Sequence, residues 1–447
     1  MKEKTVEINS LNQKSQKLAS YHFYAPKGRI NDPNGVIFYK DNYHIFYQYN
    51  PYENHWNNIS IGVATSKDLL KFDDFKVALA PTKEVDGIFS GSIIEKDDNL
   101  HLIYTKHIER NNFRKESISE AFSNDGIGFK SDFKDLVDED TLPLFDSENF
   151  RDPFIYKEKD TYYLFIASRD KEENLGKVFV LRSKTLDNFK YYFEIGPLEV
   201  FGEMVECPAI GKIGDYYVLV YSKIKKDESG KDIHTTGYLL LDMDLENGDY
   251  AILKCGVMDA SKDFYAPQLF KTESGELALI SWFDSWDYKP FEQEHNLESC
   301  GIFTYPRILE IENGAIIQKP YKEIQKHVET QFKYLGGFIK TSSLIKLVAF
   351  DEFKIDFIND KNEKVLELLY YKDRLHLRSG DLIDTSIFEY KEEVVLLIML
   401  DNSSCEIFVN HGKETMSKRV YFNSDKLKLD ITKQEHIDSL IVAELKI

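Results

Sequence analysis

Asp41-Asn-Tyr-His-Ile-Phe-Tyr-Gln48 is a turn followed by a run of β-branched and aromatic residues. Such a run is typical of a β-strand that begins after a tight turn. The pattern returns four times, as Asp98-Asn-Leu-His-Leu-Ile-Tyr-Thr105, Asp160-Thr-Tyr-Tyr-Leu-Phe-Ile-Ala167, Gly214-Asp-Tyr-Tyr-Val-Leu-Val-Tyr221 and Gly275-Glu-Leu-Ala-Leu-Ile-Ser-Trp282. Equivalent positions 43, 100, 162, 216 and 277 are 57, 62, 54 and 61 residues apart. The chain therefore contains an internal repeat.

A second predicted strand precedes each of these runs by a few residues. The five are residues 32–40, 90–96, 152–157, 207–212 and 266–271. Four contain Pro near the start, where a strand tolerates it, and all five end in Lys. Each unit is thus a β-hairpin followed by enough chain for two more strands. Four strands in each of five units predict an all-β, five-bladed β-propeller; five copies argue against chance similarity in an ordinary β-sandwich.

The repeat fades after about residue 310. Residues 321–331 could form a short helix that carries Ile324 and Val328. Alternating short strands follow at 354–358, 365–370, 393–400 and 405–409, with a hairpin turn at Asn410-His411-Gly412. This spacing favours a C-terminal β-sandwich. We therefore expect a propeller over 18–320, a linker with helical character over 321–333 and a sandwich over 334–447.

Composition narrows the class of partner. The 447 residues are 42% hydrophobic and carry a formal net charge of -19. A protein this acidic repels nucleic acid and anionic membranes, and no stretch approaches 18 apolar residues. A neutral small-molecule saccharide is a better match for such a surface than either of these partners.

Four cysteines lie far apart without CxxC spacing: Cys207, Cys255, Cys300 and Cys405. They predict reduced thiols rather than disulfides or a zinc site. Residues 1–7 contain no apolar run, so we expect no signal peptide and a cytoplasmic protein. The histidines show no metal-ligand spacing, and we expect neither a metal nor an organic cofactor.

Three carboxylates stand at equivalent places in three different units. Asp32 and Asp152 begin the first strands of units one and three, and Glu206 lies directly before the Cys-Pro pair of unit four. The first strand of a propeller blade faces the central channel, so the three should converge at one mouth. Asn31 and Arg151 flank two of them. A residue before proline favours extended backbone, which should fix side-chain direction.

Converging carboxyl groups are suited to glycoside cleavage. One donates a proton to the leaving oxygen, and a second, roughly 5–5.5 Å away, attacks the anomeric carbon with retention of configuration. Crowding pushes their pKa values apart, so we expect the more buried and more strongly repelled member to keep its proton and to serve as the acid, while a bidentate Arg can hold another member ionised.

Longer motifs around these residues resemble a known family. They are His22-Phe-Tyr-Ala-Pro26, Asn31-Asp32-Pro33-Asn34-Gly35, Tyr47-Gln48-Tyr49-Asn50-Pro51, Phe89-Ser90-Gly91-Ser92, Phe150-Arg151-Asp152-Pro153, Glu206-Cys207-Pro208 and Asp263-Phe264-Tyr265-Ala266. In this order they are similar to the motifs of glycoside hydrolase family 32, the invertases, sucrose-6-phosphate hydrolases and fructanases. The resemblance covers essentially the whole chain.

The resemblance implies a retaining β-fructofuranosidase that acts on sucrose, sucrose-6-phosphate or short fructo-oligosaccharides. It implies Asp32 as nucleophile, Glu206 as acid/base and Asp152 as the carboxylate that grips the fructosyl hydroxyls. It also implies eight pocket residues: Asn31, Gln48, Trp56, Phe89, Ser90, Arg151, Tyr265 and Trp282. The implied fold, a propeller with a C-terminal β-sandwich, agrees with the repeat.

Two positions depart from the family pattern. Arg29 stands where the family usually has an aromatic residue, and Ile61-Gly62-Val63 replaces Trp-Gly-His. Both leave the carboxylates intact and put leaving-group preference in doubt. Arg29 is either a solvated surface residue or a group that reads a phosphate on the leaving glucose.

Other functions stay open at this point. A propeller glycosidase for arabinose or xylose glycans also uses three carboxylates, and a non-catalytic sugar-binding propeller shares the fold. Fructosyl transfer to a sugar is a variant of the first reaction. Cys207 is expected to be a packed neighbour of the site rather than a nucleophile. The sandwich could shield a propeller edge, extend the cleft or form a homodimer contact.

Overall fold

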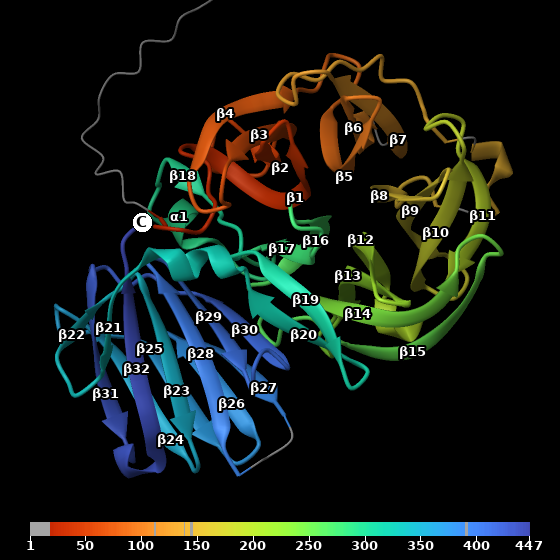
Figure 1. Cartoon of the computed structure of the whole chain (residues 1–447). Helices are drawn as coiled ribbons and strands as arrows, with labels where there is room; N and C mark the ends of the chain where they lie inside the picture. The colour runs from red at the N-terminus through yellow and green to blue at the C-terminus, as the bar shows by residue number, and fades with distance from the viewer. Residues whose placement is uncertain (1–17, 111–112, 138, 144–145, 389–391) are drawn as a thin grey trace, which may run out of the picture.

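The structure, a computed structural model, describes residues 18–110, 113–137, 139–143, 146–388 and 392–447. Residues 1–7, on which the prediction of no signal peptide depends, lie outside these ranges. Within them the chain consists mostly of strands, with few and short helices, in a ring of blades beside a two-layered sandwich (Figure 1). No helix in the described ranges has the length and apolar character needed to cross a membrane.

Five sheets form the blades, and the strands of each run in order from the channel outward. Blade one contains β1 (Gly28–Tyr39), β2 (Asn42–Asn50), β3 (Ser60–Ser66) and β4 (Phe72–Leu79). Blade two contains β5 (Gly87–Lys96), β6 (Asn99–Arg110) and β7 (Phe113–Ser123). Blade three contains β8 (Arg151–Glu158), β9 (Thr161–Asp170), β10 (Leu175–Ser183) and β11 (Lys190–Ile195). Blade four contains β12 (Met204–Ile213), β13 (Tyr216–Lys226), β14 (Asp232–Asp244) and β15 (Asp249–Val257). Blade five contains β16 (Tyr265–Lys271), β17 (Leu277–Trp282), β19 (Arg307–Glu312) and β20 (Ala315–Pro320).

All five predicted hairpins are confirmed as antiparallel pairs of the two innermost strands. The inner strands contact one another in a closed circuit, β1–β5–β8–β12–β16–β1. A late strand, β18 (Ser299–Cys300), pairs in parallel with β1 and ties the end of the propeller to its beginning. The all-β, five-bladed fold class is therefore confirmed.

Blade two differs from the prediction of four strands. Its described residues form a three-stranded sheet, and in place of a fourth strand the chain after β7 forms isolated bridges with it, Ser119 with Asp135 and Phe122 with Lys130. Short helices lie between other strands: η1 (Glu139–Thr141), η2 (Glu199–Phe201) and α1 (Phe291–Glu294).

Each inner strand is irregular at the end where the predicted site residues lie. The pairing register shifts next to Asn31–Pro33, Ser90, Asp152–Pro153, Cys207–Pro208 and Ala266–Pro267. The residues before proline were expected to be extended, but Asp152, Cys207 and Ala266 have φ of 57°, 48° and 50°. This expectation was wrong because a β-bulge places its extra residue in unusual backbone geometry, and bulges re-aim side chains beside active sites.

Neighbouring blades satisfy the backbone groups that the bulges free. The amide of Asp152 donates to Thr105 Oγ1 (2.8 Å), and the amide of Ala266 donates to Ser222 Oγ (2.8 Å). Buried amides need such partners, so each of these two bulges depends on the blade before it.

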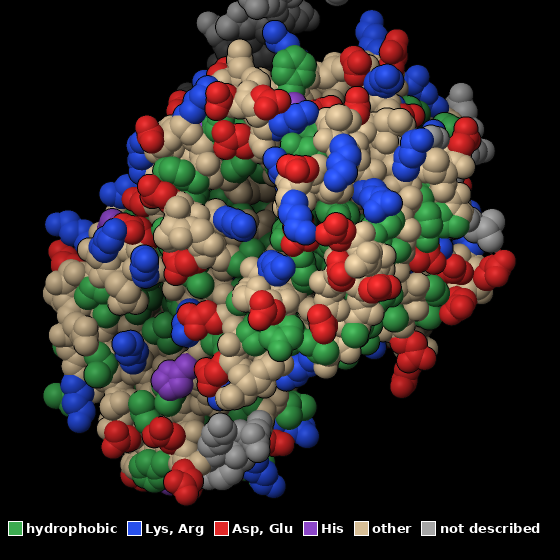
Figure 2. All heavy atoms as spheres, turned by 45° about the vertical axis from the view of Figure 1, so that its right-hand side comes forward, with side chains coloured by type: hydrophobic (Ala, Val, Ile, Leu, Met, Phe, Trp, Pro, Cys, Tyr) green, Lys and Arg blue, Asp and Glu red, His purple; other side chains and the backbone are tan. Residues whose placement is uncertain are grey.

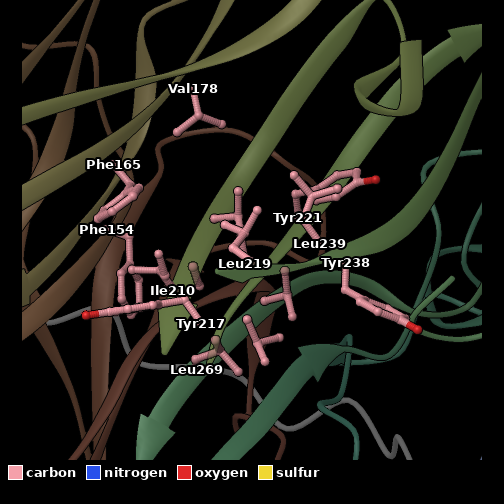
Figure 3. Close-up of a cluster of buried hydrophobic side chains, with 14 of the residues drawn as sticks. Phe154, Phe165, Val178, Ile210, Tyr217, Leu219, Tyr221, Tyr238, Leu239 and Leu269 are labelled. Atoms are coloured by element: carbon pink, nitrogen blue, oxygen red, sulfur yellow. The ribbon is translucent and has the colours of Figure 1, made fainter. Parts of the chain in front are cut away.

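The largest apolar cluster fills the space between blades three, four and five. Figure 3 shows its side chains reaching from adjacent sheets, with Phe154 and Phe165 of blade three near Ile210, Tyr217 and Leu219 of blade four. This core holds the sheets face to face, and so fixes where their inner strand ends point.

Residues 321–333 divide between a helical turn and a strand. The expected helix is a short 3₁₀ segment, η3 (Lys322–His327), which buries Ile324. The remainder is β21 (Val328–Lys333), which pairs with the last strand, β32 (Ile437–Leu445). The strands of the sandwich therefore begin at Val328, within the predicted linker, because these residues find their hydrogen-bond partners at the far end of the chain.

Two six-stranded antiparallel sheets make the sandwich and enclose its own apolar core. The first runs β21, β32, β23 (Ser343–Ala349), β28 (Val394–Asp401), β29 (Ser404–Val409) and β30 (Glu414–Arg419). The second runs β22 (Phe338–Lys340), β31 (Lys426–Thr432), β24 (Phe353–Asn359), β25 (Lys364–Tyr371), β26 (Arg374–Ser379) and β27 (Leu382–Ile387). A last 3₁₀ turn, η4 (Gln434–His436), precedes β32. The predicted hairpin turn at Asn410–Gly412 is confirmed between β29 and β30.

Buried ion pairs join the sandwich to the propeller. Arg307 of β19 is fully buried, and its guanidinium donates to Glu406 Oε2 of β29 (2.5 Å) and Asp259 Oδ2 (3.0 Å). His22, before blade one, lies between Asp401 Oδ2 and Glu406 Oε1, at 2.9 Å from each. Charges buried this deeply require partners, so the two domains are locked in one arrangement.

Candidate active site

One cavity of about 240 Å³ is lined by all three predicted carboxylates. Asp32 comes from β1, Asp152 from β8 and Glu206 from β12. Residues up to 174 positions apart in the sequence meet here because the bulges of three inner strands lie at the same end of the channel. Pockets for drug-sized ligands have about 300–1,000 Å³, so this cavity is suited to a single small sugar unit.

Asp32 is held by neutral donors. Its Oδ2 accepts from Ser90 Oγ of blade two (2.7 Å), and its Oδ1 accepts from Asn31 Nδ2 (3.2 Å). Burial raises the pKa of Asp32, while these two hydrogen bonds act in the opposite direction. A carboxylate with fixed orientation and no cation bound to it is well prepared to act as a nucleophile.

Asp152 is the most buried of the three carboxylates. Only 7% of the residue is exposed, and its Oδ2 accepts from the amide of Cys207 (3.0 Å). Burial and the charges of Glu206 and Asp32 raise the pKa of Asp152 to about 8, although Arg151 opposes this. The expectation that the most buried, most strongly repelled carboxyl is the acid was therefore wrong, because that carboxyl is Asp152 and the bidentate Arg151 binds Glu206 instead.

The Cys207 thiol touches two of the carboxylates. Its Sγ lies 3.5 Å from Asp152 Oδ2 and 3.7 Å from Asp32 Oδ2. Burial and these neighbouring carboxylates raise the pKa of Cys207 well above its usual value. A protonated thiol can donate to the carboxylates but is a poor nucleophile. No disulfide forms among the four cysteines, all of which lie in the described ranges.

Glu206 receives three charged or polar contacts. Arg151 donates to its Oε1 through Nε (3.1 Å) and Nη2 (2.9 Å), and Tyr265 donates to its Oε2 (2.6 Å). Its side chain is 17% exposed, so it lies where a leaving group could enter and leave. Asp32 and Glu206 therefore have different surroundings, as the two roles of a retaining glycosidase require.

Seven of the eight predicted pocket residues line this cavity: Asn31, Gln48, Trp56, Phe89, Ser90, Arg151 and Tyr265. The structure places the eighth, Trp282, elsewhere: it is fully buried and lies behind Trp286, with the two ring centroids 4.8 Å apart. Trp286 lines the cavity instead. The strand β17 ends at Trp282, and the chain that follows it carries the second indole to the cavity wall.

Four further lining residues were missed: Arg114, Glu116, Ile224 and His234. They belong to β7, β13 and β14, which are second and third strands of their blades. The sequence motifs that predicted the pocket do not include these four positions. Trp286 had one available signal, its position four residues after a predicted pocket tryptophan.

Arg29 is not solvated, and that expectation was wrong. The residue is 2% exposed, its Nη1 lies 3.4 Å from Cys300 Sγ, and it is absent from the cavity lining. Its guanidinium instead packs over the rings of Trp282 and Trp286. At the other position of departure from the family pattern, Ile61 and Val63 are fully buried in β3.

No group of three or more His, Cys, Asp or Glu side chains suited to a metal ion occurs in the part of the chain that the structure describes. The surface in Figure 2 intermixes acidic and basic side chains around hollows rather than presenting one field of a single sign.

Comparison with protein families gives two matches. The model of the glycosyl hydrolases family 32 N-terminal domain matches residues 22–320, and the model of the family 32 C-terminal domain matches residues 356–446. The first alone covers more than half of the chain and includes all three carboxylates.

Relatives and solved structures agree with these matches. A sucrose-6-phosphate hydrolase of Zymomonas mobilis subsp. mobilis is 30% identical over 91% of this chain and 88% of its own length. A raffinose invertase of Escherichia coli is 30% identical over 92% of this chain and 91% of its own. The structure of sucrose-6-phosphate hydrolase from Lactobacillus gasseri has a TM-score of 0.84 at 23% identity, covering 96% of this chain and 93% of that one.

Proposed function

The chain belongs to glycosyl hydrolase family 32, and from this premise we propose that it is a retaining β-fructofuranosidase. Its substrates are the terminal β-fructosides of sucrose, sucrose-6-phosphate or short fructo-oligosaccharides. The observation that carries the proposal is the meeting of Asp32, Asp152 and Glu206 in one cavity of single-sugar size.

Each carboxylate has a distinct role in this reaction. Asp32 attacks the anomeric carbon of the fructosyl unit while Glu206 donates a proton to the departing oxygen. Glu206 then takes a proton from water, and the activated water releases fructose from Asp32. The residues that surround Asp32 hold it in place for both steps.

Asp152 binds the sugar hydroxyls and thereby changes which carboxyl group holds the proton. In the free protein burial and the charge of Glu206 raise the pKa of Asp152, so Asp152 takes up a proton. Hydroxyl groups that donate to Asp152 favour its ionised form, which leaves the proton for Glu206. Binding of the fructosyl unit thus prepares the acid.

The decisive experiment measures fructose release from sucrose by the wild type, Asp32→Asn and Glu206→Gln. We expect both variants to lose activity by about 10³-fold or more, since each lacks a group that the covalent mechanism requires. Asp215→Asn is the matched control, because Asp215 is exposed in the hairpin turn at the opposite end of β12. Normal turnover by either site variant would refute the assignment.

Substrate preference needs a separate comparison. The values of kcat/KM for sucrose, sucrose-6-phosphate, a kestose-type trisaccharide and inulin separate the candidates, and sugar products separate transfer from hydrolysis. Turnover of arabinosides or xylosides in place of fructosides favours the alternative glycosidase, and tight sugar binding without turnover favours a binding propeller.

The cytoplasmic location and the homodimer stay predictions. Cell fractionation tests the first, and light scattering tests the second.

A further inference from the structure

Glu116 is a fully buried carboxylate in the cavity wall for which the proposed reaction has no role yet. Its Oε2 accepts from Arg151 Nη1 (2.9 Å) and its Oε1 from Arg114 Nη2 (2.8 Å), with His107 Nδ1 at 3.6 Å. Although burial opposes it, Arg151, His107 and Arg114 lower the pKa of Glu116 to about 2. The carboxylate is therefore a permanent negative charge inside the site.

Arg151 lies between this charge and Glu206. Its Nε and Nη2 both point to Glu206 Oε1, and its Nη1 bonds Glu116 Oε2 and Asn149 Oδ1 (3.1 Å). Only 12% of the Arg151 side chain is exposed, so little water screens these charges. One positive charge is thus divided between two carboxylates.

This division matters because Glu206 must be protonated to act as an acid. A guanidinium that served Glu206 alone would hold it ionised and make it a poor donor. A permanent negative charge on the other side of the guanidinium offsets that effect. It also fixes the rotamer of Arg151, whose planar fork must face Glu206.

We propose that Glu116 is a positioning residue, which holds Arg151 against Glu206 and offsets its charge so that Glu206 keeps the proton it donates. The inference rests on the proposed role of Glu206. Arg114, at the outer end of the same chain of charges, weakens the offset because it neutralises part of Glu116.

Other charged and titratable groups face these two carboxylates. Around Glu206 they are Arg151, Tyr265, Asp152, Asp32 and Cys207, with His234 in the same cavity wall, and around Glu116 they are Arg114, His107 and Arg151. Glu116 and Arg114 can be changed without removing the catalytic carboxylates or a direct hydrogen bond to them. Variants at these two positions therefore test the effect of charge on Glu206 while its direct hydrogen bonds are kept.

The experiment records kcat for sucrose against pH for the wild type and three variants, because kcat reports ionisation in the substrate complex, where Glu206 holds the proton. Glu116→Gln keeps the shape but removes the charge, so the fall of activity on the alkaline side should move to lower pH by about 0.5–1 unit. Arg114→Gln removes the cation that neutralises part of Glu116, so the fall of activity on the alkaline side, the alkaline limb of the profile, should move to higher pH. Asn149→Ala deletes an uncharged contact to Arg151 and should leave the limb in place.

Opposite shifts support the inference, whereas unmoved limbs, or shifts of both charge variants in one direction, overturn it. If Glu116→Gln does not fold, the exposed Arg114 still tests the sign of the effect. A wild type inactive on every β-fructoside refutes the proposed function itself. An active wild type whose limbs do not move in the variants refutes only the role of Glu116.

Discussion

The Arg29 guanidinium lies 5.2 Å from the centroid of the Trp286 ring, behind the wall of the active-site cavity. It lies 5.5 Å from Trp282 as well, and its Nη1 contacts Cys300. A buried cation over an indole stabilises the ring's position. The aromatic wall of the sugar pocket is therefore backed by a charge that does not line the cavity.

Arg29→Ala should loosen this wall rather than change phosphate recognition. We expect KM to rise several-fold for every β-fructoside, with the ratio of kcat/KM for sucrose-6-phosphate to that for sucrose unchanged. Stability should fall by about 1–3 kcal/mol, from the lost cation–π contact and the vacated space. Arg29→Lys keeps the charge without the planar fork and is the matched control. A loss confined to the phosphorylated substrate would restore the phosphate hypothesis.

Asp152→Asn should raise stability while it abolishes activity. Ionising Asp152 is unfavourable in the folded site, where its pKa is raised to about 8, against about 3.9 in an unfolded chain. Between these values the folded state binds more protons, so this group makes stability fall as pH rises from about 4 to 8. The amide removes that dependence. Melting temperatures at pH 5 and pH 8 should show a gain of about 1–3 kcal/mol that is larger at pH 8. A lower melting temperature than the wild type at pH 8 would contradict this.

Ser90→Ala should shift the acid side of the pH profile. The hydroxyl donates to Asp32 Oδ2 at 2.7 Å and favours the ionised nucleophile. Without this hydrogen bond the ionised form of Asp32 is less favoured, so the rise of activity on the acid side should move to a pH higher by about 0.5–1 unit. A hydrogen bond to a charged group contributes about 1.5–3 kcal/mol, which sets the upper limit of the shift.

Ser92→Ala is the control for that measurement. Ser92 Oγ donates to the carbonyl of Pro153 and accepts from the amide of Ile155, and so supports blade three without touching Asp32. Ser92→Ala should change stability and leave the rise of activity on the acid side, the acid limb of the pH profile, at the same pH. An acid limb that moves equally in both variants would point to general loosening of the site.

His22→Gln should weaken the attachment of the sandwich in a pH-dependent way. Both ring nitrogens face carboxylates, which accept only, so the imidazolium is the form that satisfies both. Burial opposes the charge, but hydrogen bonds to Asp401 and Glu406 raise the pKa of His22 overall. The stabilisation is complete below about pH 6.5 and is lost as pH rises through the raised value.

The difference in melting temperature between wild type and His22→Gln should thus be larger at pH 6 than at pH 9, corresponding to about 2–4 kcal/mol at the lower pH. His411→Gln, at an exposed turn residue, serves as control. An equal difference at both pH values would mean that His22 contributes shape and not charge.

Local pattern was enough to predict the two inner strands of each blade and their pairing. The repeats around Tyr43 and its four equivalents, with a turn between each pair of strands, specify hairpins through contacts only a few residues apart. Because Asp32 and Asp152 begin the first strands of their units and Glu206 directly precedes the Cys-Pro pair of another, their convergence followed from the fold class. Seven of the predicted pocket residues lay close to the same strand ends.

What the sequence could not determine depends on contacts between blades. The left-handed backbone of Asp152 and Cys207 exists because a bulge is stabilised by groups of other strands, against the local preference before proline. Glu116 entered the site from β7, an outer strand of its blade, and Trp282 was replaced by Trp286, because side-chain packing decides which residue reaches the cavity. Sequence thus determined the strands and the carboxylates they carry, whereas tertiary structure decided the charges and aromatic rings around them, since these come from segments whose spacing carries no local signal.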